Sequence, residues 1–185
     1  MIKIHNDFPV YLIRKFHVPL FGKKKIIKKI LENKNIYEDY YKCKNGHSIP
    51  LNKDYNNFFK KLYSKYYNFC YRKFNFTKHP HSKSTCWSYV SDKKYFEEFW
   101  HNHIMSSTIN GVYYLNVPKN DNVTIDFELN KNILTHKVSN YDLLIFPNYL
   151  NHKPNRCYKD GYRISINMEI ICNESSVKIF NELKK

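Results

Sequence analysis

The sequence lacks both a long apolar segment and a secretory signal. No run of 18 apolar residues occurs in its 185 residues, so no segment is expected to span a membrane. The stretch from Met1 to Phe8 has no continuous apolar core and no small-residue cleavage site, which argues against a signal peptide. A chain of this length can bury a core of its own, and we expect one compact domain.

Paired cysteine motifs are also missing. The chain has five cysteines, which is an odd number, and they are widely spaced without any C-x-x-C pair. This pattern disfavours a disulfide framework and a zinc ribbon. It favours a reducing environment, and we therefore expect a cytoplasmic protein.

Arginine is scarce although the chain is strongly basic. The net charge is +15, but the only arginines are Arg14, Arg72, Arg156 and Arg163. Proteins that read nucleic acids rely on arginine for two-point contacts with bases and phosphates. We therefore interpret the charge as a solvated lysine surface, with incidental polyanion binding at low salt and no specific nucleic-acid interface.

Residues 1–84 and 85–185 differ in their patterns. In the first region, Lys23–Lys34 and Leu51–Phe76 carry apolar residues at helical spacing, which predicts two helices within an otherwise irregular support region. The apolar stripe of Lys23–Lys34 could bind a membrane surface or a partner, but packing against a sheet fits it better.

The region 85–185 has the pattern of a β-protein. Short β-rich runs are separated by clusters of Asn, Asp, Lys, Gly and Pro. These runs are Cys86–Val90, Ile109–Val117, Val123–Leu129, Leu134–Val138, Asp142–Phe146 and Tyr162–Ile171. They predict two antiparallel sheets packed face to face, as in a sandwich, jelly roll or barrel, with the helices on one outer face. A closing helix is expected at Ser175–Lys185.

Three histidines in the β-rich region are candidate metal ligands. His101 and His103 are two residues apart, so in an extended segment both imidazoles face the same side. His152 follows the run Asp142–Phe146, where a surface histidine in a turn would be the ordinary interpretation. A second H-x-H match, His79–His81, is interpreted as a loop because such short motifs often occur by chance.

The last β-rich run presents a polar face. Arg163, Ser165 and Asn167 alternate with apolar residues and therefore lie on one side of the strand. That side could simply be exposed to solvent. However, an arginine and a serine two residues apart also offer a guanidinium fork and a hydroxyl to a single carboxylate. We expect Arg163 and Ser165 to point into the barrel, on the side of the histidines.

The order of these motifs resembles that of the Fe(II)/2-oxoglutarate-dependent oxygenases. In this superfamily an H-x-[DE] pair, a distal histidine and a following arginine lie on a double-stranded β-helix, which is a jelly roll. The segment Asn110–Pro118 is similar to the S-G-V-Y-Y-L strand of small phage and bacterial members, and to the Y-Y-L-N strand of prolyl-hydroxylase-like enzymes. The resemblance covers residues 87–171, roughly half of the chain.

The resemblance implies that His101, His103 and His152 bind Fe(II) facially and that their ring nitrogens converge. One position departs from the family pattern, because His103 stands where the family has an acidic residue. Three histidines keep the facial geometry but remove one negative charge from the ligands. Alternatively, His103 is not a ligand, and water or a group of the substrate takes its place.

The resemblance also implies a co-substrate and a reaction. Arg163 and Ser165 would bind the distal carboxylate of 2-oxoglutarate, and Tyr114 would contribute its hydroxyl. With O2, and with ascorbate as a candidate reductant, the products would be succinate, CO2 and an oxidised prime substrate. Hydroxylation is the expected outcome, and desaturation, demethylation or ring closure would fit the same motif. That substrate is a small molecule, a protein or a nucleic acid, and we expect loops at the barrel mouth and the aromatic stretch Tyr55–Phe76 to form its pocket.

Two other functions fit a jelly roll. A cupin-type metalloprotein also begins with H-x-H, but cupins add a glutamate shortly afterwards, and Ile104–Gly111 contains none. A cupin has no use for the Arg163–Ser165 pair either. The second alternative is a non-catalytic binding or structural module, in which the histidines would be incidental.

Overall fold

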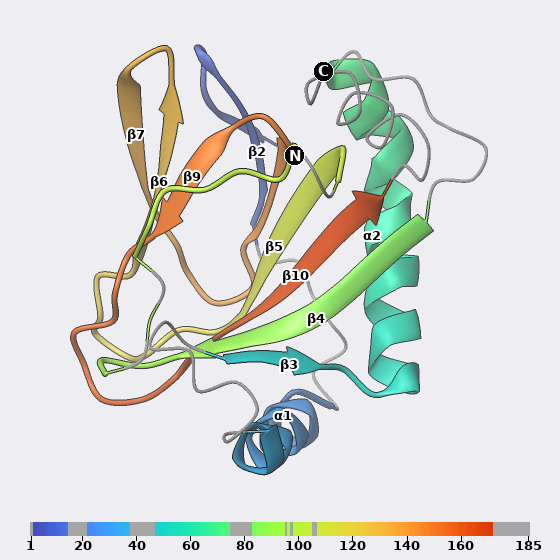
Figure 1. The fold of residues 1–185 in the computed structure, drawn as a ribbon, viewed down its shortest axis with the longest axis vertical. Helices are drawn as coiled ribbons and strands as arrows, with labels where there is room; N and C mark the ends of the chain where they lie inside the picture. Colours follow the sequence, from blue (N-terminus) through green and yellow to red (C-terminus); the bar gives the residue numbers. More distant parts are fainter. Residues whose placement is uncertain are drawn as a thin grey trace, which may run out of the picture.

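Two antiparallel β-sheets pack against each other, and two helices cover the outer face of the larger one (Figure 1). This architecture, predicted above from the alternating pattern, is confirmed in a computed structural model. The structure describes residues 2–14, 22–37, 47–74, 83–94, 96, 98–104 and 107–171.

The larger sheet has the strand order β1-β2-β8-β5-β10-β4-β3. Its strands are β1 (Ile2–His5), β2 (Phe8–Ile13), β3 (His47–Pro50), β4 (Lys83–Ser91), β5 (Ile109–Asn116), β8 (Leu143–Pro147) and β10 (Arg163–Ile171). The smaller sheet has the order β7-β6-β9. Its strands are β6 (Thr124–Leu129), β7 (Asn132–Lys137) and β9 (Asn151–Pro154).

All six predicted runs are strands, but four further strands were not predicted. Three of these, β1, β2 and β3, belong to the N-terminal region, where β2 pairs with β8 and β3 pairs with β4. The first 84 residues therefore contribute strands to the larger sheet as well as helices. The fourth, β9, carries His152 and pairs with β6. The helix expected at Ser175–Lys185 lies outside the described residues.

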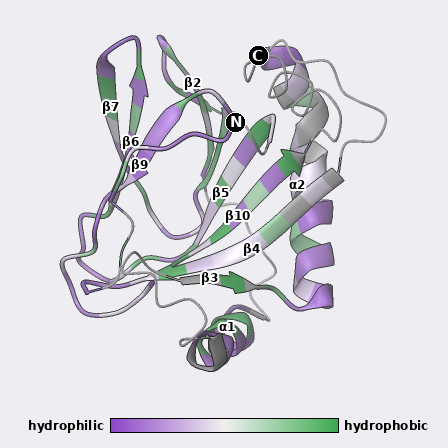
Figure 2. Ribbon diagram, in the orientation of Figure 1, coloured by the Kyte–Doolittle hydropathy of each residue, from purple (hydrophilic) through white to green (hydrophobic). Residues whose placement is uncertain are grey.

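Alternation along the strands separates two hydrophobic cores. In β8, Leu143 and Ile145 belong to the core between the larger sheet and the helices, whereas Leu144 and Phe146 belong to the core between the two sheets. All four side chains are fully buried. Figure 2 shows the same alternation of hydrophobic and hydrophilic residues along β10. Both faces of the central strands are thus covered, which is typical of the middle layer in a layered fold.

The two helices pack on the larger sheet as expected. Helix α1 (Lys23–Tyr37) buries Ile26 and Ile30, and helix α2 (Lys53–Lys73) buries Phe59 and Tyr63. Tyr63 approaches β5 so closely that a Cβ atom at Gly111 would overlap with its ring. Neither helix is apolar over a length that could cross a membrane, and this holds for every helix within the described residues.

Candidate metal centre

His101 and His152 are held side by side by their own backbones. His101 donates its N–H to the carbonyl of His152 at 3.0 Å, and His152 donates back to His101 at 2.9 Å. Such reciprocal pairing places two residues directly opposite each other, so that their side chains project to the same side. Their imidazole centroids lie 4.2 Å apart. Because His152 belongs to β9, the ring arises from the edge of the smaller sheet rather than from a surface turn.

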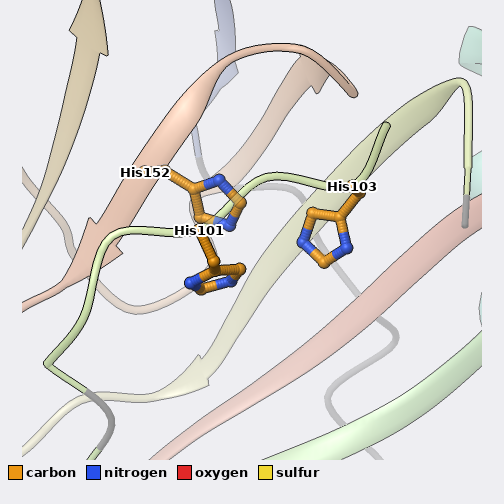
Figure 3. Close-up of side chains that lie close together, drawn as sticks. All are labelled: His101, His103 and His152. Carbon is orange, nitrogen blue, oxygen red and sulfur yellow. The ribbon is translucent and has the colours of Figure 1, made fainter. Parts of the chain in front are cut away.

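His103 is fixed next to this pair. It donates its N–H to the carbonyl of Asn148 at 2.9 Å, and its own carbonyl accepts the N–H of Ser107 at 2.9 Å. Its ring stacks on His152 with centroids 5.1 Å apart and lies 5.3 Å from the ring of His101. Figure 3 shows the three imidazoles gathered over one point.

The three rings converge as expected for ligands of one metal ion. One ring nitrogen from each histidine lies within 4.8 Å of the other two. This separation falls within the roughly 3–5 Å expected for nitrogens that share an ion at about 2 Å. The geometric expectation for His101, His103 and His152 is therefore confirmed.

Each imidazole uses Nδ1 for an oxygen partner. Nδ1 of His101 lies 3.2 Å from the carbonyl of Phe99, and Nδ1 of His152 lies 3.2 Å from the carbonyl of Leu150. Nδ1 of His103 lies 2.7 Å from a carboxylate oxygen of Glu169. In the tautomer that donates Nδ1–H to these oxygens, Nε2 keeps its lone pair, which is the form that binds a metal.

Burial also favours the neutral form of His152, which is the form that binds a metal. Its side chain is buried, and burial lowers the pKa of His152 well below its usual value. The imidazoles of His101 and His103 lower this pKa further, while the carbonyl of Leu150 opposes the shift. His152 is consequently neutral at physiological pH and can donate an electron pair without first losing a proton.

Polar side chains support the two backbones from the other side. Asn102, between the two H-x-H histidines, donates its amide to Asn151 Oδ1 at 2.8 Å. Asn151 in turn donates to Glu128 Oε2 at 3.2 Å. This chain of hydrogen bonds ties the H-x-H segment to β9 and β6, and so limits movement of the histidines relative to each other.

The histidines line a cavity of about 210 Å³ between the two sheets. This is far more than the ~10–15 Å³ that one water requires. Its wall includes the predicted co-substrate residues Tyr114, Arg163 and Ser165. The structure therefore brings all six predicted site residues to one cavity.

Arg163 is the most unusual group in this wall, because it is almost fully buried with a relative exposure of 2%. Its Nη1 donates to the carbonyl of Asn155 at 2.6 Å. Its Nη2 is buried without a hydrogen-bond partner, and no carboxylate pairs with the guanidinium among the residues that the structure describes. A buried cation with an unpaired donor is costly, so the site fits an anion that would accept from Nη2.

Two hydroxyl-bearing residues lie near Arg163. Ser165 is buried, and its Oγ donates to Asn167 Oδ1 at 3.1 Å. Tyr114 lies directly across from Ser165 on β5 and is also buried. Burial raises the pKa of Tyr114, and the positive charge of Arg163 only partly opposes this shift. The Tyr114 phenol is therefore neutral and can donate its hydrogen to an anion.

The donor set fits both groups that the resemblance implied. Three imidazole ligands suit a first-row divalent metal ion such as Fe(II), and they leave coordination positions open for other ligands. At another part of the same wall, the unpaired Nη2 of Arg163 fits a carboxylate. A dicarboxylate that also reaches the metal would satisfy both parts of the cavity.

Among the cavity residues that the sequence analysis did not name, Glu169 and Asn110 carry polar groups that bear on the site. Glu169 lies on β10 in the alternation that begins with Arg163 and Ser165, so the same period-2 argument extended by one step would have included it. Asn110 lies across from Glu169 on β5, is buried, and has an amide nitrogen without a partner among the described residues. No pattern distinguishes this asparagine from the many others in the chain.

The expectation that Tyr55–Phe76 helps to form the pocket was wrong for the residues that the structure describes. The cavity lies on the face of the larger sheet that meets the smaller sheet, and no residue of α2 lines it. The helix instead packs its buried residues Phe59 and Tyr63 on the opposite face. The aromatic residues of this stretch serve the core, because their helical spacing gives α2 one apolar side.

Comparisons with known proteins agree with the fold. No family model matches the sequence, and no curated protein matches it. Among solved structures, a prolyl-4-hydroxylase from Pseudomonas putida is similar, with a TM-score of 0.63 and 11% identity over 90% of this chain and 94% of that one. HygX from Streptomyces hygroscopicus, with nickel and 2-oxoglutarate bound, has a TM-score of 0.60 and 8% identity over 90% and 84%.

A third structure is a prolyl hydroxylase from Trichoplax adhaerens in complex with a hypoxia-inducible factor peptide. It has a TM-score of 0.56 and 14% identity, over 94% of this chain and 88% of that one. Likeness at such low identity is a likeness of fold. In its fold, this chain is a jelly-roll protein that resembles the Fe(II)/2-oxoglutarate-dependent oxygenases.

Proposed function

We propose that the chain is a non-haem Fe(II)- and 2-oxoglutarate-dependent dioxygenase that hydroxylates a prime substrate. His101, His103 and His152 hold the metal, and Arg163, Ser165 and Tyr114 bind the distal carboxylate of 2-oxoglutarate. The similar structures support the superfamily. The side chains of this chain's own cavity support the reaction.

One observation carries the proposal. A cluster of three converging imidazoles and a buried, incompletely paired guanidinium line the same cavity. A metal-binding jelly roll of the cupin type would need the first feature but not the second. A non-catalytic module would need neither, and it would gain nothing from burying Arg163 without a carboxylate.

Different residues of the cavity orient the metal ligands, bind the co-substrate and exclude water. The backbone pairing of His101 with His152, together with the asparagine bonds behind them, keeps the imidazoles oriented before any metal binds. Arg163 fixes the co-substrate by a two-point contact, and the buried hydroxyls near it limit the orientations that the carboxylate can adopt. Apolar neighbours such as Phe146, whose ring lies 4.8 Å from that of His152, exclude water from this side. When bound, Fe(II) and 2-oxoglutarate supply the oxygen-activating chemistry.

The test is a turnover assay that needs no prime substrate. Metal-free protein is loaded with Fe(II) under anaerobic conditions, mixed with 2-oxoglutarate and ascorbate, and exposed to O2, and succinate is measured. We expect slow succinate formation that a chelator abolishes and that N-oxalylglycine inhibits. As a control, Arg156→Lys should leave this activity unchanged, because Arg156 binds Glu98 at the surface and does not line the cavity.

The outcome also separates the alternatives. Metal binding without any effect of 2-oxoglutarate on the metal spectrum would favour the cupin-type function. Absence of binding for Fe(II), Co(II) and Ni(II) would favour the non-catalytic module.

A further inference from the structure

Glu169 contacts the candidate metal centre without belonging to the histidine cluster. Its Oε1 lies 2.7 Å from Nδ1 of His103, a distance typical of a strong, charge-assisted hydrogen bond. Both side chains are largely shielded, with relative exposures of 9% for Glu169 and 22% for His103. The Nδ1 atoms of His101 and His152 lie next to backbone carbonyls instead.

The position of Glu169 follows from the register of β10. Arg163, Ser165, Asn167 and Glu169 all line the cavity, because side chains on one strand alternate between its two faces. The strand thus carries a cation at its first residue and an anion six residues later. Strand geometry separates these two Cα atoms by about 20 Å, so the charges serve different parts of the cavity wall.

The described part of the chain offers Glu169 no second ionic partner that would explain its burial. Among the residues that the structure describes, no lysine or arginine forms an ion pair with this carboxylate. A buried carboxylate is costly unless a positive charge or several donors compensate it. The ring of His103 supplies one contact to it, through Nδ1. A divalent metal on the far nitrogen of the same ring would supply the missing positive charge.

The charge of the three histidine ligands also connects Glu169 with the metal. Three imidazoles bring no negative charge to a divalent cation, whereas the H-x-[DE] pattern that this sequence resembles brings one. A carboxylate that accepts a hydrogen bond from a ligating imidazole fixes the tautomer of the ring and makes its other nitrogen a stronger donor. Glu169 is placed to do both for His103, which stands at the position of the absent acidic ligand.

We infer that Glu169 is the positioning residue of the metal centre, and that its charge compensates for the acidic ligand that His103 replaces. This inference rests on the proposed function, because it assumes that His103 binds the metal. It assigns Glu169 to neither catalysis nor direct ligation. Its carboxylate holds His103 with Nε2 directed at the metal and lowers the net positive charge of the loaded site.

The first test measures metal affinity rather than activity. Metal-free wild type and Glu169→Gln are titrated with Co(II) and with Fe(II) under anaerobic conditions. The amide keeps the size of the carboxylate but removes its charge, and we expect affinity to fall about 10- to 100-fold. Glu98→Gln is the matched control, because Glu98 pairs with Arg156 outside the cavity, and its metal affinity should equal that of wild type.

Thermal unfolding of the metal-free variants tests a purely structural role. If Glu169 only stabilises the fold, Glu169→Gln should lower the unfolding temperature without metal. We expect this temperature to be unchanged or higher, since the substitution removes a buried charge with a single partner.

A double substitution tests whether the charge of Glu169 matters, because the effect of Glu169→Gln on Co(II) affinity should change its direction. His103→Asp introduces an acidic ligand next to Glu169, and the two carboxylates should repel each other. In that background, Glu169→Gln should strengthen Co(II) binding, although it weakens binding in the wild-type background. An equal loss in both backgrounds, or an unchanged affinity of Glu169→Gln in the wild-type background, would overturn the inference while leaving the proposed function intact. Failure of the wild type to bind either ion would overturn both.

Discussion

The two faces of β10 share one backbone and have opposite chemistry. Ile164, Ile166, Met168 and Ile170 enter the core beneath the helices, and all four are buried. The residues that alternate with them, from Arg163 to Glu169, line the cavity and include the buried side chains of Arg163 and Glu169. One face therefore stabilises the fold, while the other holds charges that weaken it until a ligand compensates them. Substitutions on the two faces should accordingly affect different measurements.

The largest effect is expected on the cavity side. His152→Ala removes the most buried of the three imidazoles, and only two nitrogen ligands remain for the metal. Iron binding and succinate formation should be lost together, below detection in a titration and in the turnover assay. Far-UV circular dichroism should stay the same, because the backbone bonds of His152 with His101 do not involve the side chain. Retention of iron binding would show that His152 is not a ligand.

On the helix side, Gly111→Ala should affect stability alone. The new methyl group would overlap with the Tyr63 ring, and overpacking in a core costs about 1–3 kcal/mol. This outweighs the ~0.4–1 kcal/mol that replacing a glycine gains through the unfolded chain. Denaturant unfolding should therefore show a net loss, with the iron affinity of the folded protein unchanged.

The Tyr63 ring provides a control for this explanation. In a Tyr63→Ala background the space beside Gly111 is open, so adding Gly111→Ala should cost little further stability. Equal costs in both backgrounds would contradict the overlap and would place the defect in the strand itself.

Arg163→Lys should separate co-substrate binding from metal binding on the cavity face. Lysine keeps the charge but loses the planar two-point contact. A charged hydrogen bond contributes roughly 1.5–3 kcal/mol, so we expect KM for 2-oxoglutarate to rise about 10- to 100-fold with iron affinity nearly unchanged. If KM stayed the same, the buried guanidinium would have a purely structural role.

Much of this division could be predicted from the sequence, because alternation along a strand is a local signal. The period-2 pattern of Arg163, Ser165 and Asn167 indicated that these residues share one face of the strand. The Arg163–Ser165 pair on that face suggested a carboxylate as its ligand. The convergence of His101, His103 and His152 was predicted from their order and from a resemblance, since spacing alone does not bring residues 49 positions apart into contact.

What could not be predicted depends on non-local pairing. Strands β1 and β3 have four residues each, too short to show a period, and they become strands because a partner offers its edge. Strand β9 is equally short, so His152 resembled a turn residue until its pairing with β6 was known. The contact of Glu169 with His103 also joins distant segments, and no local pattern specifies it.

The smallest effect is expected for His136, which like His152 is a histidine between the two sheets. His152 lies in the cavity, whereas His136 of β7 does not line it, and its Nε2 is buried without a partner among the described residues. Burial lowers the pKa of His136, and the charge of Arg14 lowers it further. The unfolded chain therefore binds more protons than the folded protein as the pH falls below about 6.5. This contribution to stability is complete above that pH and is lost below it.

His136→Gln cannot be protonated, so the free energy of unfolding should fall less between pH 7 and pH 5 in this variant than in the wild type. Denaturant unfolding at both pH values measures the difference, to which His152 contributes equally in both proteins. A difference between wild type and His136→Gln that does not change with pH would show that His136 does not titrate differently on folding.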